Sequence, residues 1–197
     1  TLPAVQQSAW PQRSLDAFVL AKLEEHHLQP APATDRRTYI RRVAMTLTGL
    51  LPTEEEVNAY LADDAPGADA RLVARWLDSS HYGERWSRHW LDVARYGEDQ
   101  AHTFQARMYP QGYRYRDWVT SAFNRDLPYD QFVTAQIAGD LLPAATDEER
   151  IARLPALGFF ALGPVYYADA GCADKAAADE IDDRIDTLCR GMLGLTV

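Results

Sequence analysis

The stretch that decides the fold is His81-Tyr-Gly-Glu-Arg-Trp-Ser-Arg-His-Trp-Leu-Asp-Val-Ala-Arg-Tyr-Gly-Glu-Asp-Gln-Ala-His102. It holds three of the five histidines and two of the five tryptophans of the chain. Trp86, Trp90 and Val93 recur at spacings of four and three, which places them on one face of a helix. We therefore expect a helix whose aromatic face is buried in the core.

A second face of the same helix is polar, because the helical spacing also joins Arg85, His89, Asp92 and Tyr96. Asp92 follows His89 by three residues, close enough on a helix to hold the imidazole and raise its pKa. Arg85 and Arg95 supply guanidinium groups that can bind an anion. Two interpretations stay open at this point. The face is either a binding site for a carboxylate, sulfate or sugar acid, or a buried network of salt bridges between helices.

Composition limits the class of protein. With 197 residues, of which 47% are hydrophobic and 25% charged, the chain can bury a substantial core. Its formal net charge of −9 argues against a general nucleic-acid binder, which needs a basic surface. No apolar run approaches the roughly 20 residues of a membrane span, and no signal peptide is present. The chain begins Thr-Leu-Pro rather than Met, so we expect a processed chain or an excised segment.

The rest of the chain favours helices throughout. Apolar residues recur with helical spacing, and no segment alternates with the period of two that a strand requires. Capping boxes at Thr53–Glu56 and Thr146–Glu149, and a capping Asp35, predict three helix starts. Residues 103–112 lack any period and predict an ordered loop that passes over the central helix. The fold class is therefore predicted to be all-α, an irregular bundle of about seven to nine helices with one long ordered loop.

The expected domain organisation is simple. Residues 1–13 are predicted to form an extended lead-in, and residues 14–197 a single α-helical domain, with 14–80 and 81–197 as its potential sub-units. The tail is predicted to be one long helix over 174–195. An apolar seam runs along it at alternating spacings of four and three: Ile181, Ile185, Leu188, Met192 and Leu195. We expect this seam to pack on a partner helix within the same domain.

Two groups of acids and histidine suggest metal binding. Glu98, Asp99 and His102 lie three or four residues apart, so they face one ion if the central helix continues past Gly97. Asp182 and Asp186 share a face in the acidic run of the tail helix, which makes a calcium site conceivable. The spacing of an EF-hand is absent, however, so a solvated face is the alternative for the tail.

Ion pairing is the other alternative for that acidic run. Asp183 and Arg184 can pair with the arginines of the second predicted helix, where Arg36, Arg37, Arg41 and Arg42 form a basic stripe. The two cysteines lack metal-ligand spacing and allow one disulfide at most. We expect Cys172 and Cys189 to be unpaired thiols.

Aromatic residues crowd the middle of the chain, between positions 82 and 129. Aromatic rings beside carboxylates are typical of sugar-binding clefts, although rings at helical spacing are also typical of a core. A glycosidase would further need two carboxylates about 5–10 Å apart. The motifs of common serine hydrolases, P-loop proteins and zinc peptidases are absent.

Long segments of the sequence match a known family. They are 15–23, 41–52, 80–96, 113–118, 124–132, 136–140, 181–186 and 193–196, and they include Tyr113-Arg-Tyr-Arg-Asp-Trp118 and Ile181-Asp-Asp-Arg-Ile-Asp186. On these segments the chain resembles the planctomycetal cytochrome-associated domain of unknown function, over nearly its whole length.

The resemblance implies a context rather than a reaction. In such proteins a secretion signal and a c-type-cytochrome-like domain usually precede this domain, and a second uncharacterised domain follows it. Typical members continue past the equivalent of residues 193–197 into a Cys-x-x-Cys-His haem-attachment motif. The chain as given has no haem site of its own. If the parent protein carries haem c just beyond Val197, we expect one of His81, His89, His102 and Met108 to be its axial ligand or neighbour.

Three functions are compatible with these observations. The leading one is a helical module of an extracytoplasmic, c-type-cytochrome-linked protein, which packs around a haem-bearing segment or a partner domain. The second is an enzyme acting on polysaccharide or sulfated sugar, with a working face of Arg85, His89, Asp92, Glu98, Asp99 and His102. The third is a module that binds carbohydrate or another surface. Whether the chain is an enzyme is left open.

Overall fold

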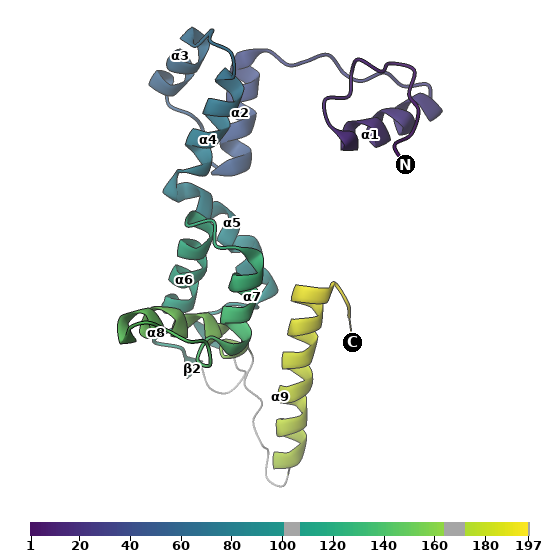
Figure 1. The fold of residues 1–197 in the computed structure, drawn as a ribbon. Helices are drawn as coiled ribbons and strands as arrows, with labels where there is room; N and C mark the ends of the chain where they lie inside the picture. The colour runs from purple at the N-terminus through teal and green to yellow at the C-terminus, as the bar shows by residue number, and fades with distance from the viewer. Residues whose placement is uncertain (101–106, 164–171, 197) are drawn as a thin grey trace. The chain divides into compact units, whose positions relative to one another are not determined.

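The computed structural model describes residues 1–100, 107–163 and 172–196. Nine α-helices account for most of this described part, so the predicted all-α class is confirmed. The helices are α1 (Ser14–Glu25), α2 (Arg36–Leu47), α3 (Glu54–Ala62), α4 (Ala68–Leu77), α5 (Ser80–Val93), α6 (Tyr113–Asn124), α7 (Tyr129–Ala138), α8 (Asp147–Arg153) and α9 (Ala173–Leu188). A 3₁₀-helix, η1 (Leu154–Phe160), follows α8, and a π-helical turn, η2 (Cys189–Leu193), extends α9 (Figure 1).

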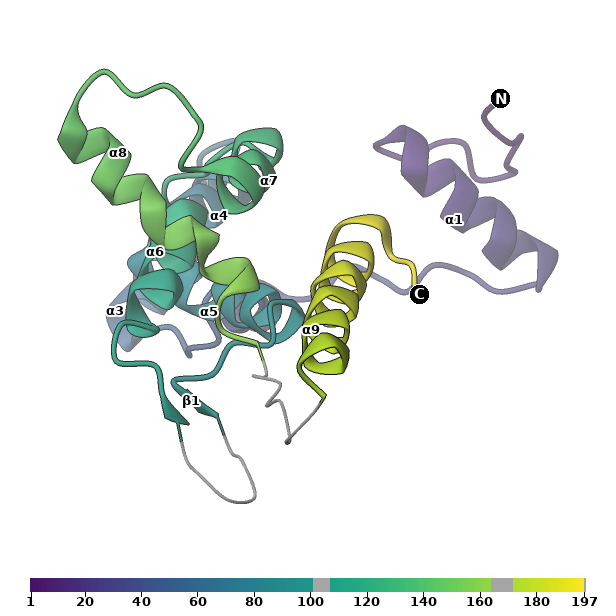
Figure 2. The same cartoon turned by 90° about the horizontal axis from the view of Figure 1, so that it is seen from below.

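A short antiparallel pair of strands interrupts the helices after α5. Strand β1 (Asp99–Gln100) pairs with β2 (Arg107–Met108), in a register that places Asp99 opposite Met108 (Figure 2). The predicted ordered loop over 103–112 therefore contains a strand at 107–108, which its lack of period did not indicate. Residues 101–106 of this region lie outside the described part of the chain.

The chain divides into two units, Thr1–Tyr39 and Ile40–Val197. In the first unit, the carboxylate of Glu24 accepts hydrogen bonds from the backbone N–H groups of Gln6 and Gln7, at 3.0 and 3.1 Å. These bonds attach the lead-in to α1. The second unit contains the core and all the candidate site residues.

Side chains set the helix starts largely as predicted. Asp35 accepts the N–H of Thr38 at 2.9 Å, and this hydrogen bond lowers the pKa of the Asp35 carboxyl. At α3, Glu56 N–H donates to the Thr53 hydroxyl, while Thr53 N–H donates to the Glu56 carboxylate. The capping Thr146 of α8 is confirmed in the same way, since it accepts the N–H of Glu149 at 3.2 Å.

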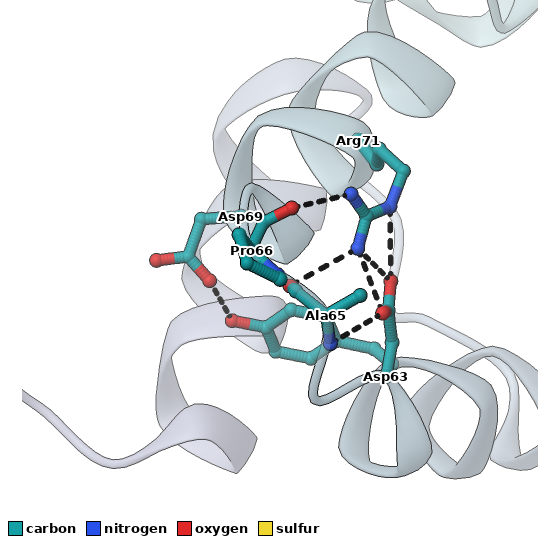
Figure 3. A network of polar contacts seen from close by, with 6 residues as sticks. Asp63, Ala65, Pro66, Asp69 and Arg71 are labelled. Carbon is teal, nitrogen blue, oxygen red and sulfur yellow. Dashed lines mark hydrogen bonds and ion pairs between the residues drawn. The ribbon is translucent and has the colours of Figure 1, made fainter.

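The turn between α3 and α4 is held by one arginine (Figure 3). Arg71 donates from Nε and Nη2 to the carboxylate of Asp63, at 3.1 and 2.7 Å, and from Nη1 to the carbonyl of Pro66 at 2.8 Å. Tyr60 donates its hydroxyl proton to Asp69 at 2.5 Å across the same turn. These hydrogen bonds connect α3, the turn and α4, so they fix the turn.

The main core lies where α5, α6, α7 and η1 meet. Its fully buried side chains include Tyr115, Val119 and Phe159, and Trp118 stacks on Phe132 with ring centroids 5.4 Å apart. Gln136 is buried at the centre and is the acceptor for two donors: the Tyr115 hydroxyl and Trp90 Nε1, each at 2.7 Å. One amide oxygen thus connects α5, α6 and α7.

The face of α5 that enters the core is only partly the predicted one, since Trp90 packs against the core cluster but smaller residues are the most buried. Buried positions on α5 are Gly83, Ser87 and Leu91, whereas Trp86 and Trp90 are half-buried and Val93 is 37% exposed. A Cβ atom at Gly83 would lie 2.4 Å from the carbonyl oxygen of Thr120 on α6. Because α6 approaches this closely, only small residues fit at the contact, and the tryptophans lie at its flanks.

The predicted seam of α9 is also only partly correct. Met192, at its far end, packs against the core cluster. Ile181 and Ile185, however, are 58% and 48% exposed. The seam therefore has no partner helix over most of its length within the described residues. No helix among the described residues is both long enough and apolar enough to cross a membrane.

Candidate functional site

The central helix ends earlier than the sequence suggested. Arg95 N–H donates to the carbonyl of Asp92 at 3.2 Å, and Tyr96 N–H donates to the carbonyl of Leu91 at 2.9 Å. Arg95 itself is left-handed, with φ of 55°. This pair of bonds around a left-handed residue is a Schellman motif, which terminates a helix. Glu98 and Asp99 therefore leave the helix before they can share a helical face.

Arg95 turns this helix end into a contact with α9. Its guanidinium forms an ion pair with Asp183, which is half-buried like Arg95 itself. The Arg95 Nε atom is buried without a hydrogen-bond partner among the described residues. Gly163 makes room for the pair, since a Cβ there would lie 2.9 Å from Arg95 Nη2. The predicted pairing of Asp183 with the arginines of α2 is wrong, because Asp183 forms its ion pair with Arg95.

A polar cluster follows directly on the helix end. Tyr96 donates its hydroxyl proton to the Glu98 carboxylate at 2.6 Å, and Glu98 also forms an ion pair with Arg116 of α6. Arg116 Nε further contacts Asp117 at 3.1 Å. Burial of the phenol, helped by its hydrogen bond to Glu98, raises the pKa of Tyr96 to about 12. The predicted site residue Glu98 is thus neutralised by a neighbour that the sequence reasoning missed.

The predicted polar face of α5 is not assembled as expected. His89 and Asp92 are both exposed, and no hydrogen bond joins them in the structure, although Trp86 contacts the His89 ring at a centroid distance of 5.4 Å. Arg85 is half-buried, and its Cδ atom lies 3.2 Å from where a Cβ of Gly49 would be. Arg85 therefore packs against the end of α2 rather than beside His89 and Asp92 in a common cleft.

The candidate metal ligands are dispersed in the described part of the chain. The side chain of Asp99 and the whole of His102 lie outside the described residues. Asp186 pairs with Arg190 at 2.7 Å, while Asp182 is exposed. No group of three or more histidine, cysteine or carboxylate side chains positioned for a metal ion is found within the described residues.

The candidate haem neighbours have ordinary surroundings. His81 Nδ1 lies 2.8 Å from the Glu84 carboxylate on the first turn of α5. Met108 is exposed on β2.

Cys172 and Cys189 are both free thiols, as predicted. Within the described residues, the imidazole rings of His81 and His89 form no hydrogen bond to a serine or cysteine side chain that would activate a nucleophile.

A groove between α5 and α6 was not anticipated. The two helices run antiparallel, because Gly83 N–H donates to Asn124 at 2.7 Å and Thr120 donates to Ser87 at 3.1 Å (Figure 1). The groove along them, called the α5–α6 groove below, has a volume of about 580 Å³. It is lined by Glu84, Ser87, Arg88, Leu91, Arg116, Asp117, Thr120, Ser121, Asn124 and Arg125. The sequence indicates this groove only through polar residues that recur at spacings of three and four along both helices.

These features define a helical protein with ion-paired surface clusters, a polar groove and an exposed apolar seam, rather than a recognisable catalytic centre. Residues 14–197 match the family described as "PSCyt2: Protein of unknown function (DUF1549)", and the chain belongs to that family. This match confirms the part of the resemblance that concerns membership of a domain family of unknown function. No curated protein and no solved structure matches the chain.

Proposed function

We propose that the chain is a helical module of an extracytoplasmic, c-type-cytochrome-linked multidomain protein, and that it packs against a haem-bearing segment or a partner domain. The observation that carries the proposal is the apolar seam of α9. Ile181 and Ile185 are exposed on it, as are Leu193 and Leu195 just beyond. Membership of a family named for an unknown function is compatible with this role and specifies no other.

The seam has the properties of a docking surface. Each aliphatic side chain gains about 1.5–3 kcal/mol when it is moved fully from water into an apolar contact. The seam residues are spaced as in helices that pack on other helices, and one end is anchored because Met192 reaches the core cluster. A helix that is fixed at one end and exposes its apolar stripe beyond is suited to receive a partner.

A second apolar surface supports the same role. A groove of about 500 Å³ lies between the turn that precedes α6 and the segment formed by α8 and η1. Its lining includes Tyr109, Pro110, Ile151, Leu157 and Leu162. Exposed apolar surfaces of this kind are typical of interaction sites between domains.

The enzymatic alternative receives less support from the described residues. Hydrolysis of a glycoside needs two free carboxylates across the scissile bond. In the polar cluster, Glu98 and Asp117 are both engaged by Arg116. We therefore advance no reaction for this face.

The docking role is tested by hydrogen exchange of α9 in the isolated chain and in the whole gene product. Exchange across 173–188 is expected to be slower in the whole protein, because a partner covers the seam. Ile181→Glu is expected to remove that extra protection, whereas Leu141→Glu, at a position 80% exposed outside the seam, is expected to preserve it. Equal exchange of α9 in both proteins would refute the docking role.

The cytochrome link is tested separately. A pyridine-haemochrome spectrum of the whole gene product is expected to show the bands of haem c. A haem-free product would refute the link while leaving the docking result to stand on its own.

A further inference from the structure

The charged side chains that line the α5–α6 groove are three arginines, Arg88, Arg116 and Arg125, and two carboxylates, Glu84 and Asp117. Glu84 is 2.8 Å from His81 Nδ1, and Asp117 is 3.1 Å from Arg116 Nε. Arg116 is in turn shared with Glu98. Cationic side chains therefore outnumber carboxylates in the lining of the groove, and this excess favours the entry of an anion.

Two arginines of the same groove are not compensated. Arg88 of α5 and Arg125 at the end of α6 form no ion pair with a carboxylate in the part of the chain that the structure describes. Arg125 is held in place by a hydrogen bond from its Nε to the carbonyl of Ser121, at 3.3 Å. Its remaining N–H groups stay available. In a chain with a formal net charge of −9, this groove gathers cationic groups that lack partners.

The floor of the groove adds neutral hydrogen-bonding groups. Thr120 donates to the hydroxyl of Ser87 at 3.1 Å, and Ser87 is buried beneath the groove. Ser121 is exposed beside them and has a free hydroxyl. Hydroxyl groups next to guanidinium groups can donate to the same anion, which strengthens binding without adding charge.

We propose that the α5–α6 groove binds a tetrahedral oxyanion, a sulfate or phosphate group, between Arg88 and Arg125. Guanidinium groups bind such anions with paired N–H donors. Two arginines that approach from different helices match an anion with oxygens on several sides better than a planar carboxylate. The inference does not depend on the docking role of α9, because the groove is formed by α5 and α6 alone.

The test is a titration of the full chain with sodium sulfate and, separately, with sodium phosphate at low ionic strength, followed by backbone amide NMR. Saturable shifts are expected at 87, 88, 120, 121 and 125. The Arg88→Gln/Arg125→Gln variant is expected to bind at least about tenfold more weakly, which corresponds to about 1.4 kcal/mol. Arg42→Gln, at an exposed position on α2, is the matched control and is expected to bind as the unchanged chain does.

Each outcome decides the proposal. Saturable binding that the double variant loses and the control retains supports the site, and the anion with the lower Kd identifies the group it prefers. Absence of saturable shifts, or an equal loss in Arg42→Gln, overturns it. Equal affinity for sodium acetate overturns the preference for a tetrahedral anion.

Discussion

Arg95 and Asp183 form an ion pair although 88 positions separate them in the chain. Arg95 is the left-handed residue that ends α5, and Asp183 lies in the middle of α9. A glycine is the usual residue at such a helix end, because a side chain there costs about 1–2 kcal/mol. The ion pair explains why arginine occupies the position: the same residue that terminates α5 attaches α9.

The coupling of this pair is measurable by a double-mutant cycle. Asp183→Asn is expected to lower the free energy of unfolding by about 1–2 kcal/mol, since it leaves a half-buried guanidinium without its partner. The coupling between Asp183→Asn and Arg95→Ala is expected to be about 1 kcal/mol in urea unfolding. Arg95→Gly is expected to be about 1 kcal/mol more stable than Arg95→Ala, because glycine relieves the left-handed backbone. A less stable glycine variant would contradict this account.

The close approach of α5 and α6 predicts a penalty for the smallest added side chain. Gly83→Ala places a methyl group 2.4 Å from the Thr120 carbonyl oxygen and 2.5 Å from Asn124 Oδ1. Overpacking of this kind costs about 1–3 kcal/mol, more than the roughly 1 kcal/mol that alanine gains over glycine in a helix. The change in urea midpoint reports the difference. Glu84→Ala, one residue further along and exposed, is the control, and a stabilised Gly83→Ala would be inconsistent with the packing described.

The hydrogen bonds that Gln136 accepts predict that its replacement by an apolar residue lowers stability. Gln136→Leu removes the acceptor of the buried Tyr115 hydroxyl, while Trp90 Nε1 keeps the Tyr115 oxygen as an acceptor at 3.1 Å. An unsatisfied buried donor costs about 1–3 kcal/mol, so thermal or urea unfolding is expected to show a loss in that range. Gln131→Leu carries the same substitution on the exposed side of α7 and is expected to change stability by less than about 0.5 kcal/mol. Similar losses in the two variants would argue against the network.

The raised pKa of Tyr96 predicts a loss of stability in alkali. Its phenol stays neutral in the folded chain up to about pH 12, whereas in the unfolded chain it ionises near its ordinary pKa of 10. The stabilisation is therefore complete below pH 10 and is lost as the pH rises toward 12. Urea unfolding across this range is expected to show a steeper decline for the unchanged chain than for Tyr96→Phe. Tyr129→Phe removes an exposed tyrosine and serves as the control; parallel curves for all three proteins would refute the prediction.

Helix positions were predictable because they depend on local chemistry. Capping by Asp35, Thr53 and Thr146 involves residues three apart, and such signals are visible in the sequence alone. The termination of α5 was not visible, because its left-handed residue is Arg95 rather than glycine. The hydrogen bonds that end the helix are local, but the partner of the Arg95 side chain is Asp183, far along the chain, and no local pattern reveals that partner.

The prediction of the buried face of α5 was incomplete for a different reason, although Trp90 does pack against the core cluster. Hydrophobic periodicity gives weight to large side chains, and it therefore selected Trp86, Trp90 and Val93. The contact with α6 instead uses Gly83 and Ser87, whose value is that they are small. The candidate site also differs from the predicted one. Arg116 of α6 pairs with Glu98, which follows α5, and only the folded structure brings these two residues together.

The small residues at the α5–α6 contact also bear on how relatives of this chain can diverge. The two helices are joined through Gly83, Ser87 and the backbone of α6, beneath the groove. Arg88 and Arg125 line the groove, and neither takes part in those hydrogen bonds. Replacing them alters what the surface attracts and leaves the helix pair intact. Substitution at these two positions is therefore expected to change the anion binding proposed for the groove while the helix pair keeps its contact.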